Sequence, residues 1–350
     1  MAGVLHALPY VHTLFPYGDC GTRTLHAYYT LWQQELPGGE LRRGTALSGL
    51  NYLEACTIGL LQGVTELFPI SSLGHSILLP AFIGGKWAKD LDMTATGSPY
   101  LAFLVLAHVA TALALVAFFW RDWVRIIGAL WSSIRDRKVE TAEEKLAWLL
   151  IIGTIPVGLV GIVLDKALRT HLGKPEPAAA FLLLNGLVLL AADRLLKTAR
   201  KGRHADDSNG VQGSTESSDI ASDRRLSRLG WKSALFIGGS QALALLPGIS
   251  RSGVTMVSGL ARGLNHEDAA RFAFLLATPV ILAAGLYKAP ELAKPENHSI
   301  LGPAIAGSLV SGIAAYISVK FLTKYFETGK LTPFAIYCAV AGGFSLIWFA

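Results

Sequence analysis

LEACTIGLLQGVTELFPISSLGHSILLP, residues 53–80, is an apolar stretch that polar side chains interrupt. Gln62, Glu66 and His75 lie inside it, and an ionisable group in hydrocarbon costs about 3 kcal/mol unless it faces protein or water. Pro69 ends the preceding helix, because proline cannot continue the hydrogen-bond ladder. The stretch therefore predicts a membrane helix that breaks halfway, with a functional site near the break.

The first broken helix is too short to cross a bilayer. Asn51 followed by Glu54 resembles a capping box, so we expect a helix that runs to about Phe68. Sixteen residues, 53–68, cover about 24 Å, whereas the hydrocarbon core is about 30 Å thick. A second short helix, Ser72–Ile83, would return the chain to its starting face. Such backbone is tolerated at membrane depth only where protein buries it or where it lines a wet cavity.

The same pattern returns 179 positions later. The identical pairs are Ile58 and Ile237, Gly59 and Gly238, Gln62 and Gln241, Leu67 and Leu246, Ile70 and Ile249, Ser71 and Ser250, and Gly74 and Gly253. We infer an internal duplication. The second copy is expected to have a helix over Trp231–Leu246, a bend at PGISRSG (247–253) and a return helix over Val254–Gly263.

The composition is typical of a polytopic membrane protein. Of 350 residues, 52% are hydrophobic and only 16% are charged, which is far from the profile of soluble globular chains. No basic segment followed by a sustained apolar run opens the chain, so we expect no cleaved signal peptide. A net charge of +6 in a membrane protein is usually carried by cytosolic loops. We therefore expect the bilayer, and no nucleic acid, as a partner.

Other chemistries lack their motifs. The three cysteines show no C-x-x-C spacing, so neither a disulfide framework nor a thiolate metal site is indicated. No Walker loop, Rossmann fingerprint or H-E-x-x-H is present. Nucleotide-driven transport therefore has no support.

Three full spans follow each broken element. They are expected over Pro99–Trp120, Leu146–Leu164, Ala178–Leu196, Ala269–Tyr287, Leu301–Leu322 and Leu331–Phe349. Basic residues gather in 121–138 and 197–228, which places these segments in the cytosol. Because three is odd, the second copy must enter from the opposite face. The predicted fold is an all-α polytopic membrane protein of two inverted repeats, each a re-entrant helix pair plus three transmembrane helices.

The expected organisation has an extension and one membrane domain. Residues 1–50 form an N-terminal extension of unknown role, and residues 51–350 form the membrane domain. Within that domain, repeat 1 covers 51–196 and repeat 2 covers 231–350. The polar tract 197–230 between them is expected to be a disordered cytosolic loop. His108, near a span end, is expected to have an ordinary interfacial role.

The first motif offers a carboxylate, hydroxyls and a histidine. Gln62 and Glu66 share one helix face and can hold a divalent cation, position water or pair with Arg251. Ser71, Ser72 and His75 begin the return helix, where free amides attract anions. A serine activated by the histidine would be a nucleophile, or the histidine would act on water. The plainer alternatives are a structural Glu66 paired with arginine, a capping Ser71 and a merely buried His75.

The second motif, PGISRSG at 247–253, suits phosphate oxygens. Gly248 allows close backbone approach, and the Ser250 and Ser252 hydroxyls converge with the Arg251 guanidinium where a helix begins. Thr255, four residues beyond Arg251, can add a hydroxyl from the same face. The plainer alternative is a structural arginine tied to the acidic residue of the first motif.

These motifs resemble a known family. QGVTELFPISSLGH at 62–75 and PGISRSGVT at 247–255 are similar to the two signature regions of bacterial undecaprenyl-diphosphate phosphatases, the bacitracin-resistance family. The resemblance runs from about Leu53 to the C-terminus and includes PFAIY at 333–337. It implies a multi-pass enzyme of the inner (plasma) membrane, with an outward-facing site, that removes the terminal phosphate of undecaprenyl diphosphate and recycles the carrier lipid for cell-wall synthesis.

The resemblance also implies residue roles. Ser72, His75, Glu66 and Arg251 would be catalytic; Ser71, Gly248, Ser250, Arg251, Ser252 and Thr255 would bind the polyprenyl diphosphate; and Glu66 with Gln62 would hold Mg²⁺ or Ca²⁺. The position of Gln62 is often Glu in relatives. Ser72 is the preferred nucleophile with His75 as its acid-base partner, while attack by His75 or by water stays open. A second copy of the chain, in a homodimer, is a candidate partner. The rival class is a secondary transporter or flippase of an anionic lipid.

Overall fold

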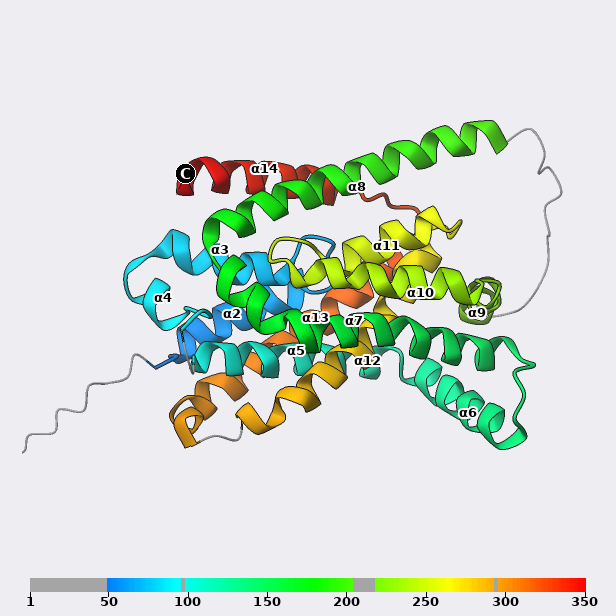
Figure 1. Cartoon of the computed structure of the whole chain (residues 1–350), viewed down its shortest axis with the longest axis horizontal. Coiled ribbons are helices and arrows are strands. Elements are labelled where there is room, and N and C mark those ends of the chain that lie inside the picture. Colours follow the sequence, from blue (N-terminus) through cyan, green and yellow to red (C-terminus); the bar gives the residue numbers. More distant parts are fainter. Residues whose placement is uncertain (1–48, 96–97, 204–217, 293–294) are drawn as a thin grey trace, which may run out of the picture. The chain divides into compact units, whose positions relative to one another are not determined.

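The structure is a computed structural model that describes residues 49–95, 98–203, 218–292 and 295–350. Every regular element in these ranges is a helix, as the sequence predicts. Six helices contain segments long and apolar enough to span a membrane. They are α5 (Pro99–Phe118), α7 (Ala142–Leu172), α8 (Pro175–Arg203), α12 (His266–Leu292), α13 (Leu301–Phe326) and α14 (Thr332–Phe349) (Figure 1). The chain is a multi-pass membrane protein, and residues 1–48 of the expected extension lie outside the described ranges.

The first broken element agrees with its prediction except at one end. It consists of α2 (Tyr52–Thr65), turns over 66–70 and α3 (Ser72–Ile83). The capping box is present, with both of its hydrogen bonds at 3.0 Å. Helix α2 stops at Thr65 rather than near Phe68, because the Pro69 ring would clash with the Thr65 carbonyl four residues earlier in a continued helix. A short helix, α4 (Gly85–Asp90), follows.

The second broken element differs from its prediction at both helices. Helix α10 (Trp231–Ser240) tightens into a 3₁₀ turn, η1 (Gln241–Leu245). The return helix α11 (Arg251–Ala261) begins three residues before the predicted Val254, because the Ser250 hydroxyl caps it by accepting from the Gly253 N–H at 3.1 Å. Arg251 therefore lies in the first turn of a helix, not in the bend.

The two copies interlock through their spans. Helix α13 packs against α2 and α5, α14 against α8, α10 against α7, and α12 against α5. In Figure 1, α14 runs beside α8. Each of these contacts joins a helix of the first copy to a helix of the second. The order of broken element and spans is the same in both copies. Insertion of the broken elements from opposite faces stays a prediction.

Small residues allow the closest of these contacts. A Cβ built on Gly59 of α2 would collide with the backbone of Gly307 in α13, and one built on Gly307 would collide with the carbonyl of Ala55. Between helices in a membrane, such small residues let the backbones approach and gain van der Waals contact. This contact holds α2, which carries Gln62, against the second copy.

The connection between α5 and α7 contains an additional helix, α6 (Trp120–Asp136), where the sequence indicated only a basic segment. Its exposed apolar side chains recur on one face; they are Trp120, Val124, Ile127, Trp131 and Ile134. A helix of this kind lies in the plane of a membrane interface.

The predicted disordered loop 197–230 is wrong for part of its length. Helix α8 continues to Arg203, and residues 218–227 form α9 (Ser218–Ser227), while 204–217 lie outside the described residues. Buried Asp223 accepts hydrogen bonds from Arg125 of α6 at 2.9 Å and Arg271 of α12 at 3.0 Å. Charged groups in a tract that was expected to be disordered therefore pair with the membrane domain, and these ion pairs help to order residues 218–227.

Candidate active site

The two bends touch each other. A Cβ built on Gly74 would lie 2.9 Å from the Cα of Gly248. The Ser71 hydroxyl oxygen accepts from the N–H groups of both glycines at 3.2 Å. Gly248 has a φ of 109°, which favours glycine, and Ser71 has a φ of 70°. The capping alternative for Ser71 is thus what the structure shows, and its oxygen also joins one bend to the other.

A buried asparagine bridges the bends from a third element. Asn185 of α8 donates to the Pro69 carbonyl at 3.0 Å and accepts from the Ser250 N–H at 3.1 Å. Sequence reasoning missed this residue. Its signal was a single amide side chain in an otherwise apolar span, since polar groups at such depth usually have an assigned partner.

Glu66 and Arg251 meet at the centre of the cluster. The Oε1 atom of Glu66 accepts from Arg251 Nε at 3.3 Å and Nη2 at 3.1 Å. Its Oε2 atom accepts from Ser72 Oγ at 2.5 Å and Gln62 Nε2 at 3.1 Å. The Glu66 side chain is only 6% exposed. Of the alternatives that the sequence left open for Glu66, the structure shows the pairing with the arginine of the second motif.

His75 is hydrogen-bonded to groups other than Ser72, the serine that it was expected to activate. Nδ1 of His75 lies 2.7 Å from the Ser71 carbonyl, and Nε2 lies 2.7 Å from the Tyr337 hydroxyl. A carbonyl only accepts, so Nδ1 carries the proton and Nε2 accepts from Tyr337 in the neutral ring. The ring also stacks on Tyr337, with centroids 5.7 Å apart. Ser72 donates to Glu66 instead, so the carboxylate of Glu66 is the acceptor beside this hydroxyl.

The hydroxyls of the second motif are bound to backbone rather than free. Ser250 caps α11, Ser252 donates to the Phe68 carbonyl at 3.1 Å, and Thr255 donates to the Arg251 carbonyl at 2.7 Å. By contrast, Nη1 of Arg251 is buried and has no hydrogen-bond partner among the described residues. The donor left for an anion is therefore the guanidinium.

His108 is a second residue that sequence reasoning misplaced. Its Nε2 atom lies 3.3 Å from Glu66 Oε2, so the expected interfacial role is wrong. The available signal was a lone imidazole among the apolar residues of α5. Packing of α5 against α2 brings it to the site.

The side chains around Glu66 supply only some of the oxygen ligands that Mg²⁺ or Ca²⁺ requires. Gln62 Oε1 is buried and has no partner among the described residues, and Glu66 offers a carboxylate. Across the described ranges, no group of three or more His, Cys, Asp or Glu side chains could hold a metal ion. Mg²⁺ sites often combine one or two protein oxygens with substrate phosphates. The residues therefore fit a cation that a diphosphate helps to coordinate.

Comparisons with known proteins identify the family. Residues 55–344 match the family model described as Bacitracin resistance protein BacA. The chain belongs to this family. It is 58% identical over 301 residues to a protein named undecaprenyl-diphosphatase from Mycolicibacterium paratuberculosis, covering 86% of this chain and 98% of the relative. It is 46% identical over 368 residues to undecaprenyl-diphosphatase 1 of Frankia casuarinae, covering 87% and 99% of the two chains.

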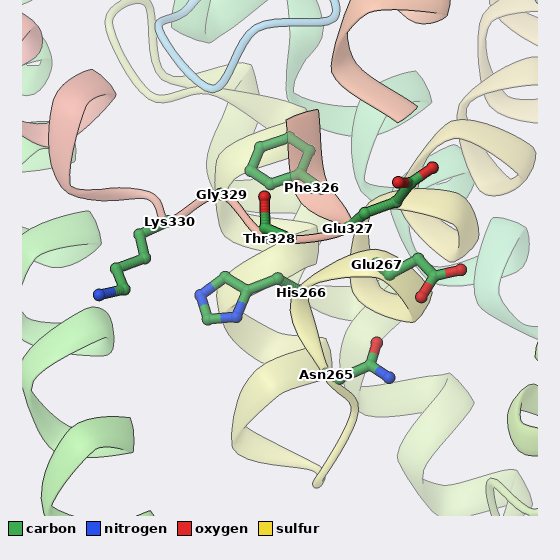
Figure 2. A pocket seen from close by; sticks show the side chains of 8 residues that line it. All are labelled: Asn265, His266, Glu267, Phe326, Glu327, Thr328, Gly329 and Lys330. Carbon is green, nitrogen blue, oxygen red and sulfur yellow. The ribbon is translucent and has the colours of Figure 1, made fainter. Parts of the chain in front are cut away.

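A separate polar pocket lies where α12 begins and α13 ends (Figure 2). It is lined by Asn265, His266, Glu267, Phe326, Glu327, Thr328, Gly329 and Lys330. None of the site residues predicted from the motifs lines it. This pocket is therefore separate from the cluster around Glu66.

We predict that Asn185→Leu separates the bends. The variant leaves the Pro69 carbonyl and the Ser250 N–H without their partner, so the free energy of unfolding should fall by about 2 kcal/mol. The measurement is the thermal unfolding midpoint in detergent. Leu184→Ala, at the neighbouring and exposed position, is the control and should leave the midpoint nearly unchanged. Equal midpoints for the two variants would contradict the bridging role.

Proposed function

We propose that the cluster around Glu66 and Arg251 is the active site of an undecaprenyl-diphosphatase. The chain hydrolyses undecaprenyl diphosphate to undecaprenyl phosphate and inorganic phosphate, in keeping with the names of its relatives. One observation carries the placement of the site. The unpartnered Nη1 of Arg251 lies in the group that contains Ser72 and Glu66, where two helices begin.

Binding of the diphosphate would rest on the guanidinium and on helix ends. Arg251 can donate to phosphate oxygens through Nη1 while it keeps its contact with Glu66, or it can turn away from Glu66 and present a fork of donors. Helices α3 and α11 both begin at the cluster, and helix N-termini favour anions. The prenyl tail would stay in lipid between helices.

The geometry favours Ser72 as the attacking group. Its hydroxyl already donates to Glu66, so the carboxylate can take the proton as Oγ bonds to the terminal phosphorus. The bond from that phosphorus to the bridging oxygen then breaks, and undecaprenyl phosphate leaves. Water next attacks the phosphoserine, phosphate is released, and the Ser72 oxygen recovers its proton. Arg251 stabilises charge on the transferring phosphoryl group.

His75 has a different place in this scheme from the one its sequence position indicates. Its Nε2 faces the hydroxyl of Tyr337, which is 45% exposed on α14. We assign it the orientation of the bend through its bond to the Ser71 carbonyl. Attack by His75, or by a water in place of Ser72, is the alternative that the Ser72 variant below separates.

A divalent cation, Mg²⁺ or Ca²⁺, would be held by Glu66 and Gln62 together with diphosphate oxygens. When bound, it would neutralise negative charge on the diphosphate. Gln62 Oε1 and the Glu66 carboxylate are the oxygens that the chain contributes. Because one of the two is neutral, affinity for the cation in the absence of substrate should be low.

The choice of membrane and the side to which the site opens rest on the resemblance of the motifs to those of the family. We assign it to the plasma membrane, with the site open to the outside, where the chain would recycle the carrier lipid of cell-wall synthesis. A homodimer is the assembly we propose. A flippase would share the broken helices but would release no phosphate, and phosphate release by the purified chain decides between the two.

Replacement of Arg251 tests the site. Arg251→Ala should lower phosphate release from undecaprenyl diphosphate at least about 100-fold, because it removes the principal donor to the phosphoryl group. The measurement is inorganic phosphate released in detergent, with folding checked by thermal unfolding. Arg262→Ala, an exposed arginine just beyond the end of α11, is the matched control and should keep the native rate. Near-native turnover of Arg251→Ala would place the site elsewhere.

Replacement of Ser72 tests the nucleophile. With substrate radiolabelled in the terminal phosphate, rapid acid quenching should trap label on the native protein and none on Ser72→Ala, whose turnover should fall about 1,000-fold or more. Ser76→Ala, one turn further along α3, is the control and should behave as the native protein. Trapped label that persists in Ser72→Ala would assign attack to another group.

Replacement of Gln62 tests the cation. A chelator should stop phosphate release, and added Mg²⁺ should restore it. Gln62→Glu adds a second carboxylate, so the Mg²⁺ concentration for half-maximal rate should fall by about tenfold. The measurement is the rate of release over a Mg²⁺ titration of both proteins. A native rate that the chelator leaves unchanged would remove the cation from the proposal.

A further inference from the structure

His108 occupies a position in the cluster that the proposed reaction does not use. It lies in the middle of α5, and its side chain is 29% exposed. Nδ1 is 2.7 Å from the carbonyl of Leu104, and Nε2 is 3.3 Å from Glu66 Oε2. The ring is thus fixed on one side by its own helix and directed at the carboxylate on the other.

The chemistry of these neighbours defines the direction of both contacts of the ring. A backbone carbonyl and a carboxylate oxygen only accept, so each ring nitrogen of His108 must donate in this arrangement. The Leu104 carbonyl therefore sets the ring orientation, and the Nε2–H is presented to Glu66. Histidines at metal sites are oriented in the same way, because a carbonyl accepts from one ring nitrogen and so fixes the direction of the other.

The two oxygens of Glu66 have separate partners. Among the described residues, Oε1 accepts from Arg251, whereas Oε2 accepts from Ser72 and Gln62 and lies 3.3 Å from His108 Nε2. If Arg251 turns to the diphosphate, Oε1 loses its cationic partner. A buried carboxylate that loses its compensating charge is strongly destabilised unless another donor stays in place. Gln62 and His108 stay beside the oxygen that receives the Ser72 hydrogen bond, and of these two only the imidazole can carry a positive charge.

We propose that His108 is a positioning residue: it donates its Nε2–H to Glu66 Oε2 and keeps the carboxylate against Ser72 while Arg251 binds the diphosphate. The inference rests on the proposed function of the cluster. It assigns His108 to the attack step and not to substrate binding, because Nε2 of His108 lies against Glu66, which accepts the Ser72 hydrogen bond. Loss of His108 should therefore lower kcat and leave KM nearly unchanged.

The test compares His108→Ala with His108→Gln. The alanine variant should lose about 10- to 100-fold in kcat, with a KM for undecaprenyl diphosphate within about twofold of native. Glutamine offers an amide N–H of similar reach, so His108→Gln should recover most of that loss. Leu113→Ala, an exposed residue on the same helix, is the control and should keep native kinetics. Should the alanine variant not fold, His108→Leu retains the bulk and gives the same readout.

A double variant distinguishes a positioning role of His108 from direct binding of the substrate. In Glu66→Gln, where the carboxylate is absent, adding His108→Ala should cause no further loss of residual activity, since residues that act through one group are not additive. Native kcat in His108→Ala, or a loss confined to KM, would overturn the inference and leave the proposed function standing. A native chain that releases no phosphate would instead overturn the proposed function, and the role of His108 with it.

Discussion

The ion pair between Glu66 and Arg251 is the interaction on which the rest of the structure depends. The two residues are 185 positions apart and belong to different copies of the duplicated unit. A lone carboxylate or guanidinium at this depth would be expensive, and removal of either partner from a buried pair leaves the other uncompensated. Each broken helix therefore requires its counterpart, and the fold is stable at this point only when the bends meet.

The serine side chains that hold the two bends together are ones that the sequence motifs indicate as substrate ligands. The hydroxyls of Ser71, Ser250 and Ser252 are hydrogen-bonded to backbone atoms, either across the two bends or within one of them. Irregular backbone inside a membrane has free N–H and C=O groups that must be satisfied, since no water is present in the hydrocarbon. The same serines that mark a phosphate site in a sequence thus meet a structural requirement here. Ser72 and the free edge of Arg251 are left for chemistry.

The charged residues outside the spans follow the same principle. Asp223 of α9 can be buried because two arginines, from α6 and α12, donate hydrogen bonds to its carboxylate. A short polar helix would not order by itself, since it buries few apolar groups. Ion pairs to a preformed surface, together with the fully buried Leu226, order it on the membrane domain.

The sequence by itself determined the broken helices and the membrane spans. Proline positions, apolar run lengths and the Asn51–Glu54 cap are local signals, and they predicted the broken helices and the six spans. Pairing of the two motifs was one of the alternatives that the sequence left open. Only the tertiary structure decided which donors surround Glu66. Ser72 turns to Glu66 rather than His75, and His75 instead meets Tyr337, 262 positions away. Asn185 and His108 join the site because α8 and α5 pack against the bends and α2. Contacts at such separations depend on how helices pack in space, and no local pattern of residues encodes that packing.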